Sequence, residues 1–370
     1  MAPYDVLMPS NTHSSAPPYA SADAIPTLPT RLTWRDTLKR WSLRWGIARG
    51  TSRVEPGLYR IGEPSRTSPT LVTCNYRMTV DLVRRDLAGV DCWLLVLETY
   101  GVNVWCAAGK GTFGTDELVR RIFACSLADF VDHETLILPQ FGAVGVAAPK
   151  VQQLTGYRVV WGPVRSADLR EFLAAGSKAT PEMRAVTFNL AERLALAPVE
   201  FLGSLRYALW AVPALAVLAA ATASVGARSL VWVAALMALF PAFASYLLAA
   251  FAGGILTPAL LPWLPGRAFS VKGAFAGVVL AGVALAALPG MLGGQSVLGF
   301  SAVVLMVASL ASYIAVNFTG STPYTSPSGV ERELRRAVPL QAATLGAGII
   351  CWVLAWYVIG TTVLSTTPGG

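Results

Sequence analysis

The second half of the chain is almost free of charge, which strongly limits what it can fold into. From Arg206 onward it has nine charged residues, all outside five apolar stretches. Each stretch has about the twenty residues that a helix needs to cross a bilayer. We therefore predict an all-α transmembrane domain of five helices over residues 201–370. The stretches are Tyr207–Val225, Ser229–Phe251, Gly273–Leu292, Val297–Thr319 and Val338–Gly360.

The cations flanking these stretches predict their orientation. They cluster before the first stretch, between the second and third stretches, and between the fourth and fifth stretches. The segments on the opposite side of the membrane have Arg228 alone. Because cytoplasmic loops carry the excess of Lys and Arg, we expect a multi-pass protein of the cytoplasmic (inner) membrane with its C-terminus outside. The stretches contain no Asp, Glu, Lys, Arg or His, which favours an anchor over a permeation path. The clustered cations are Arg193, Arg206, Arg267, Lys272, Arg332, Arg335 and Arg336.

Residues 1–50 have two distinct parts. The first thirty are rich in Pro, Ser, Thr and Ala and are expected to be a disordered tail. In Thr33–Gly50, Trp34, Leu38, Trp41 and Trp45 follow a helical spacing among basic residues. This pattern fits a helix lying in the membrane interface. It also fits a helix that packs its Trp stripe on a globular domain, and the sequence does not decide between the two.

Residues 51–200 alternate between short apolar runs and helical periodicity. Strands are expected at Thr70–Asn75, Cys92–Glu98, Thr135–Leu138 and Arg158–Trp161. Helices are expected near Thr79–Leu87, Thr115–Ser126 and Ser166–Ala175. Such alternation predicts a cytoplasmic α/β domain with a Rossmann-like parallel sheet covered on both faces. Ligands of such sheets bind beyond the carboxyl ends of the strands.

The cysteines and the net charge exclude several kinds of site. None of the five cysteines lies within four residues of another, so the chain has no CxxC redox pair, zinc knuckle or ferredoxin cluster motif. The formal net charge is +8. No RNA-binding or zinc-finger motif accompanies it, so we expect no nucleic-acid partner.

The segment Asn103–Lys110 (NVWCAAGK) is the strongest candidate site. Asn103 can cap a short helix and place Cys106 in its first turn, where the helix dipole and Lys110 favour the thiolate. Ala107, Ala108 and Gly109 leave little side chain around the sulfur. The pattern indicates a metal-binding or nucleophilic cysteine, although a buried structural cysteine remains the alternative.

The same eight residues resemble the cap-helix signature of the corrinoid protein of microbial mercury methylation. The resemblance extends from about Val54 to the last apolar stretch. A weaker resemblance links residues 51–200 to the corrinoid domain of the large subunit of the corrinoid iron–sulfur protein. Further matching segments are Val72–Tyr76, Gly111–Leu118, Leu136–Gln140, Gly162–Val164, Lys178–Met183 and Asn317–Glu333.

The resemblance implies a corrinoid (cobalamin) cofactor with Cys106 as the lower axial ligand of cobalt. It implies a methyltransferase that passes a methyl group from cobalt to Hg(II), bound as a thiolate complex, to form methylmercury. It also implies a methyl donor from the folate-linked one-carbon pathway and a small two-cluster 4Fe–4S ferredoxin as electron donor. The implied cofactor-binding residues are Asn103, Val104, Trp105, Cys106, Ala107, Ala108, Gly109, Lys110, Gly111 and Thr112.

Other possibilities remain open from the residues. The methyl acceptor could be a cellular metabolite, or the chain could be a non-catalytic corrinoid-binding or transport module. His133 is a candidate cobalt ligand and Cys74 a candidate contact to the corrin, but a structural role is favoured for both. The segment Thr319–Ala337, in which Ser328 and Glu331 resemble a capping box, is a candidate docking loop.

Overall fold

The structure is a computed structural model that describes residues 19, 21–223, 231–288, 290, 292, 296–321 and 327–366. Its contacts divide the chain into two units. The sheet unit comprises the described residues up to Leu43 together with Ile47–Val186. The helical unit comprises Arg44–Gly46 and the described residues from Thr187 onward. Each unit is considered by itself below.

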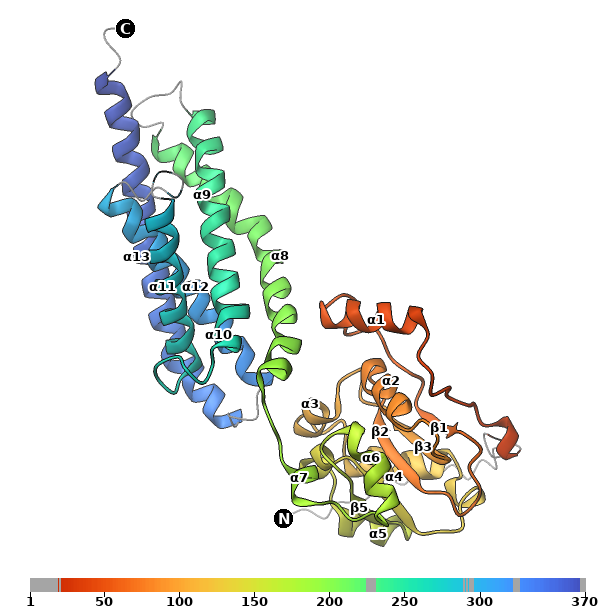
Figure 1. The fold of residues 1–370 in the computed structure, drawn as a ribbon. Coiled ribbons are helices and arrows are strands. Elements are labelled where there is room, and N and C mark those ends of the chain that lie inside the picture. The colour runs from red at the N-terminus through yellow and green to blue at the C-terminus, as the bar shows by residue number, and fades with distance from the viewer. Residues whose placement is uncertain are drawn as a thin grey trace, which may run out of the picture. The chain divides into compact units, whose positions relative to one another are not determined.

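The sheet unit contains a five-stranded sheet in the order β1-β3-β2-β4-β5 (Figure 1). Strands β2, β3, β4 and β5 are parallel, and they confirm the four strands predicted from the sequence to within one residue. β1 was not predicted, and because it pairs antiparallel with β3 the sheet is mixed. The strands are β1 (Gly57–Ile61), β2 (Thr70–Cys74), β3 (Cys92–Leu97), β4 (Thr135–Leu138) and β5 (Arg158–Trp161).

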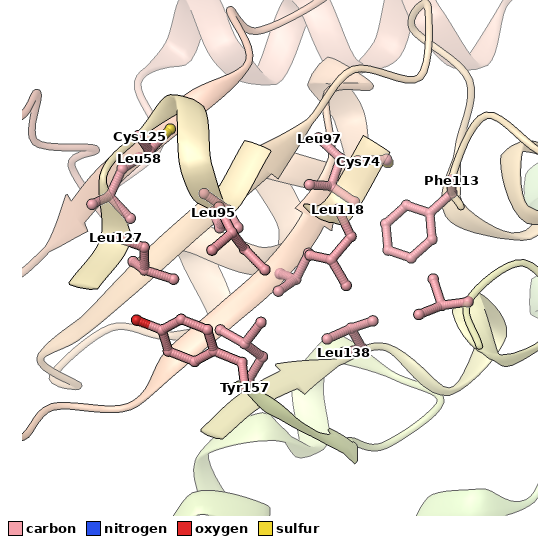
Figure 2. Close-up of a cluster of buried hydrophobic side chains, with 14 of the residues drawn as sticks. Leu58, Cys74, Leu95, Leu97, Phe113, Leu118, Cys125, Leu127, Leu138 and Tyr157 are labelled. Atoms are coloured by element: carbon pink, nitrogen blue, oxygen red, sulfur yellow. The ribbon is translucent and has the colours of Figure 1, made fainter. Parts of the chain in front are cut away.

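Two hydrophobic cores lie on opposite faces of the sheet. All six residues of β3 are buried, as expected for a central strand covered on both sides. The first core joins Trp93, Leu95 and Leu97 to helices α4 and α5, and Figure 2 shows part of it. The second core joins the alternate residues of β3 to α2 and α6. The covering helices are α2 (Arg77–Asp86), α4 (Thr115–Ala124), α5 (Ala148–Thr155) and α6 (Leu169–Ala174).

The strand order creates a switch point between β2 and β4. The chain passes from β2 through α2 to β3 on one side, and then crosses back to β4 on the other side of β2. The loops that leave β2 and β4 therefore diverge at the carboxyl edge of the sheet. In open α/β sheets such a divergence is where ligands bind.

Residues 21–30, which the sequence assigns to a disordered tail, are instead held on the sheet unit. Ile25 is buried in the first core. Arg60 of β1 donates its backbone N–H to the Pro26 carbonyl and accepts a hydrogen bond from Leu28 N. This segment covers the outer edge of β1, which removes an exposed strand edge. Residues 1–18 of the expected tail lie outside the described residues.

A network of four charges fixes α1 (Trp34–Arg44) to α2. Asp36 of α1 pairs with Arg77 and with Arg84, each at 3.0 Å. The same two arginines also pair with Asp81 of α2, at 3.1 and 2.8 Å. Arg84 further donates to the Pro29 carbonyl. Two carboxylates thus satisfy two guanidinium groups, of which Arg84 is almost fully buried.

The helical unit contains five helices that are long and apolar enough to cross a membrane. They coincide with the five predicted stretches, although the first and last begin earlier in the chain. Helix α12 contacts α9, α11 and α13. A Cβ added at Gly273 of α11 would lie 2.5 Å from Ala315 Cβ of α12, so small residues allow this close approach. The helices are α8 (Leu190–Ala223), α9 (Val231–Phe251), α11 (Phe269–Ala287), α12 (Val297–Asn317) and α13 (Pro327–Thr366), and the second span continues to Ala259 through η6 (Ala252–Leu256) and α10 (Thr257–Ala259).

The predicted docking loop Thr319–Ala337 is largely helical. Helix α13 begins at Pro327, so Ser328 lies inside the helix and the expected capping box is wrong. Glu331 instead pairs with Arg335 one turn later, at 2.7 Å. Residues 322–326 of this segment lie outside the described residues.

Replacing Asp81 by Asn should destabilise the sheet unit by about 3 kcal/mol, because it leaves the buried Arg84 charge with one partner fewer. The matched control is Asp132→Asn. Asp132 pairs with Arg66 at 2.7 Å where both side chains are 54% exposed, so its loss should cost less than about 1 kcal/mol. Pulse proteolysis of the detergent-solubilised chain in urea would measure both values. Equal losses of unfolding free energy in the two variants would contradict the importance of the charge network between α1 and α2.

Acid should release α1. Burial acts to raise the pKa of Asp36, but hydrogen bonds from Thr33 and the Arg84 guanidinium outweigh it and hold this pKa well below its usual range. The stabilisation is therefore complete above the ordinary value of 3.8 and is lost as the pH falls from there toward the lower folded pKa. Pepsin cleavage within α1 should rise over this interval. In the Asp36→Asn variant, pepsin cleavage within α1 should be high at every pH tested. Low cleavage of this variant would contradict the idea that ionised Asp36 holds α1 in place.

Candidate functional site

The loop that follows β3 is held by the side chain of Asn75, the first residue after β2. Asn75 Oδ1 accepts hydrogen bonds from Thr99 N at 3.1 Å, Thr99 Oγ1 at 2.9 Å and Gly101 N at 3.0 Å. Its Nδ2 donates to Glu98 Oε1 at 2.7 Å. Asn75 is fully buried, so this single amide fixes the path of the chain from β3 into the next helix. From the sequence, Asn75 is expected only as the last residue of a strand, although a polar residue at the end of a buried strand is a usable signal.

This loop delivers the short helix α3 (Val104–Gly109) to the carboxyl edge of the sheet. Asn103 is its N-cap, and the Asn103 side chain accepts a hydrogen bond from Cys106 N at 2.9 Å. Asn satisfies a free N–H at this position, which is why the sequence starts a helix here. The prediction that Asn103 caps a helix with Cys106 in its first turn is confirmed.

Cys106 differs from the other thiols of the sheet unit in being partly exposed. Cys74 is fully buried near Leu97, Phe113 and Leu118 (Figure 2), and burial raises the pKa of its thiol. Burial likewise raises the pKa of Cys92 to about 12 and raises that of Cys125. These three residues are therefore protonated packing groups at neutral pH, as the structural interpretation of Cys74 expects. Among the described cysteines of this unit, Cys106 is the one open to a ligand.

A cleft of about 270 Å³ lies at the switch point of the sheet, beside α3. Its walls come from the ends of β2 and β4, from α2, and from the segment that follows β5. Asn103, Val104 and Trp105 contribute from α3 and its cap, whereas Cys106 is not among the lining residues. Most of the lining is apolar, and Arg165 adds a cation. The volume is slightly below the roughly 300–1,000 Å³ typical of small-molecule pockets, so the cleft would hold only part of a large ligand.

Trp105 and Phe141 form an aromatic wall of this cleft. Their rings meet edge to face, with centroids 4.6 Å apart. Trp105 is 42% exposed, so its ring is available to a ligand. Phe141 belongs to η3 (Gln140–Val144), which follows β4. No signal in the sequence marked Phe141, because it enters the site only through the folding of η3 against α3.

The small residues of the motif have two different surroundings. Ala107 and Ala108 are buried in the first core, and a Cβ added at Gly145 would lie 2.2 Å from Phe113 O and 3.1 Å from Ala108 Cα. Ala108 therefore packs closely against Gly145, where a side chain would not fit. The exposed residues after Cys106 are instead Gly109, Lys110 and Gly111, and these leave the surface beside the thiol accessible. Thr112, the last predicted contact, donates its hydroxyl to the Ala107 carbonyl at 3.3 Å.

His133 lies at the opposite edge of the sheet. It precedes β4, whereas α3 follows β3, and the two strands run in the same direction. His133 Nε2 is 2.8 Å from the Ser68 carbonyl, and Nδ1 accepts a hydrogen bond from Thr135 N. Both ring nitrogens therefore have structural partners, which favours the structural interpretation over a role as cobalt ligand.

The donor set at the carboxyl edge fits a cofactor that brings its own metal. Within the described residues, no group of three or more His, Cys, Asp or Glu side chains could hold a metal ion. A single accessible thiol beside an apolar, aromatic-walled cleft suits a large ligand whose metal needs one axial donor from the protein. A corrinoid is a ligand of this kind.

Replacing Asn75 by Ala should destabilise the sheet unit by about 2–3 kcal/mol, because the Thr99 and Gly101 N–H groups lose their acceptor in a buried position. Asn103→Ala removes one cap bond from a partly exposed position and should cost about 1 kcal/mol. Urea unfolding of the full chain, followed by pulse proteolysis, would compare the two. A smaller effect at position 75 than at position 103 would contradict the assigned role of Asn75.

Comparison with known proteins finds similarity to subunits of acetyl-CoA synthase and decarbonylase complexes. A family model described as CO dehydrogenase/acetyl-CoA synthase delta subunit matches residues 22–173. The acetyl-CoA decarbonylase/synthase complex subunit gamma of Methanopyrus kandleri is 36% identical over 149 residues, covering 37% of this chain and 32% of that protein. The corresponding subunit of Methanocaldococcus jannaschii is 34% identical over 122 residues, covering 32% and 25%. The chain thus spans a quarter to a third of these relatives, and the matched region stops before the helices that could cross a membrane.

These findings contradict the identification with the mercury-methylation protein. The matched family and relatives are described as subunits of acetyl-CoA synthase and decarbonylase complexes. The predictions that depended on this identification are therefore also wrong. They are Hg(II) as methyl acceptor, methylmercury as product, and the ferredoxin and folate-linked partners. The physical reason is that an eight-residue signature specifies a helix cap and the surroundings of one thiol. It contains no group that selects the molecule receiving a methyl group.

Proposed function

We propose that the sheet unit binds a corrinoid through Cys106 and serves as a membrane-anchored methyl carrier. The observation that carries the proposal is the partly exposed Cys106 on a capped helix at the carboxyl edge of the sheet. The matched family and the weaker resemblance to the corrinoid iron–sulfur protein support it. When bound, a corrinoid supplies a cobalt that can accept and release a methyl group.

In this proposal the residues around Cys106 fix the ligand atom. Asn103 holds Cys106 N, and Asn75 holds the loop before it, so the thiol has a defined position before any ligand arrives. Pre-organisation of this kind reduces the entropy that is lost on binding. The exposed Gly109 and Gly111 leave the approach to the sulfur open.

The cleft beside α3 would hold a part of the cofactor away from its metal. Its apolar floor suits a ring or a methyl-rich edge, and Arg165 suits an anionic group such as a phosphate. The exposed face of Trp105 adds a surface on which a planar group can stack. A cleft of about 270 Å³ would leave most of a corrinoid accessible, as a carrier that meets partner proteins requires.

We infer that the partners are other subunits of a methyl-transfer complex. The relatives are named as subunits of the acetyl-CoA decarbonylase/synthase complex, and this chain matches only part of each. A carrier needs one protein to load the methyl group and another to receive it. The donor and acceptor sites would then lie on those proteins.

The helical unit would act as the anchor in the cytoplasmic membrane. The cations near its helix ends support a cytoplasmic location for the sheet unit, because cytoplasmic loops carry the excess of Lys and Arg. A cavity of about 210 Å³ among its helices is lined by apolar residues together with Ser245 and Tyr246. This uncharged lining supports an anchor rather than an ion path.

Cys106→Ala should remove the sulfur ligand from bound cobalt. The full-length protein would be purified in detergent and loaded with hydroxocobalamin, and bound cobalt would be followed by visible and EPR spectra. We expect a base-off, sulfur-ligated signature in the wild type that disappears in Cys106→Ala. Cys351→Ala is the matched control, because Cys351 is the partly exposed cysteine of the helical unit.

The spectrum of the control should equal that of the wild type. If no corrinoid binds to the wild type, the cofactor assignment fails. If corrinoid binds but the spectra of wild type and Cys106→Ala coincide, then Cys106 is not the ligand. Binding without transfer to any acceptor in the presence of the candidate partner subunits would contradict the carrier role.

A further inference from the structure

An apolar stripe on α1 faces away from the rest of the sheet unit. Trp34, Leu38 and Trp41 are 68%, 59% and 61% exposed, and Trp45, just past the helix, is 49% exposed. We name Trp34, Leu38 and Trp41 the tryptophan stripe. Helix α1 therefore does not pack this stripe on the globular domain, which was one of the two interpretations of the sequence.

The opposite face of α1 attaches it to the domain. Leu43 is fully buried, and the Asp36 side chain is 15% exposed between Arg77 and Arg84 of α2. Successive residues of a helix are about 100° apart, so Asp36 and Leu43 lie roughly opposite Trp34 and Leu38. The helix is thus fixed in an orientation that presents large apolar side chains outward. Because α1 is held by its opposite face, the outward direction of the stripe is fixed by the fold.

The charge around the stripe is basic. Between Ile25 and Val54 the chain has seven Lys and Arg residues and one acidic residue, Asp36, which the two arginines of α2 neutralise. Arg31, Arg35 and Lys39 are exposed. Arg35 also lies over the Trp34 ring, with its guanidinium carbon 5.3 Å from the ring centroid. The surface around the stripe therefore offers cations together with indole rings.

We propose that the tryptophan stripe and its flanking cations dock the sheet unit on the surface of an anionic lipid membrane. Trp side chains prefer the boundary between headgroups and hydrocarbon, and Lys and Arg bind the anionic headgroups beside it. The same chain has five helices that can cross a membrane, so a lipid surface is within reach of the sheet unit at all times.

The consequence is a second, reversible attachment of the sheet unit in addition to the spanning helices. Interfacial helices depend on apolar burial and on attraction to anionic lipid, so the attachment should weaken with added salt. Because α1 is joined to α2 through the charge network, docking α1 orients the whole sheet unit on the lipid. This inference does not depend on the identity of the cofactor.

Spin labels on the full-length protein can test the docking. In a Cys106→Ala/Cys351→Ala background, nitroxide labels would be attached through Leu38→Cys or, as the matched control, Leu154→Cys. Leu154 lies on α5 and is 48% exposed, so it is an exposed leucine of the same unit outside the stripe. The protein would be placed in nanodiscs of phosphatidylcholine and phosphatidylglycerol. Power saturation would then measure contact with oxygen, which enters lipid, and with a water-soluble nickel chelate.

We expect the label at position 38 to contact oxygen and to be shielded from nickel, and the label at position 154 to show the reverse. Adding Trp34→Ser and Trp41→Ser should expose the label at position 38 to nickel severalfold. Nickel contact equal at both positions would overturn the proposal. Shielding of position 38 from both reagents would also overturn it, since that outcome means that protein covers the stripe. If phosphatidylcholine alone protects position 38 equally well, the role of the cations is wrong.

Discussion

The candidate site depends on the side chain of Asn75. One buried amide accepts three hydrogen bonds from the loop after β3 and donates a fourth to Glu98. This joins the ends of β2 and β3, which are neighbours in the sheet, and sets where α3 begins. Asn103 then caps the helix, and Cys106 takes its position from that cap. A partly exposed thiol at a defined place is thus the result of two asparagines, of which Asn103 also lines the cleft.

Partition between water and lipid organises the rest of the chain. The apolar helices are long enough to cross a bilayer and pack through small residues, while the charges of the second half lie near their ends. The sheet unit holds its buried charges in pairs, most clearly where Asp36 and Asp81 meet Arg77 and Arg84. That network also decides which face of α1 is exposed. A local charge arrangement therefore controls a surface that we assign to lipid.

A sequence motif can be specific for a local structure without being specific for a reaction. The NVWCAAGK segment correctly predicted a capped helix and an accessible thiol, because these properties depend on residues close together in the chain. It led to a wrong methyl acceptor, because the groups that contact an acceptor are not part of the motif. The relatives are named for acetyl-CoA decarbonylase/synthase complexes. The matching family model covers residues 22–173, which end before the spanning helices.

The amino-acid sequence alone is enough to predict the four parallel strands, the main helices, the cap at Asn103 and the five helices able to cross a membrane. Each of these follows from periodicity or hydropathy over neighbouring residues. The folded structure was needed to find the antiparallel β1, the ordering of residues 21–30, the role of Asn75 and the cleft wall at Phe141. It also decided that the tryptophan stripe faces outward. These features depend on contacts between residues far apart in the chain, and a pattern read along the chain contains no information about which distant residues will meet.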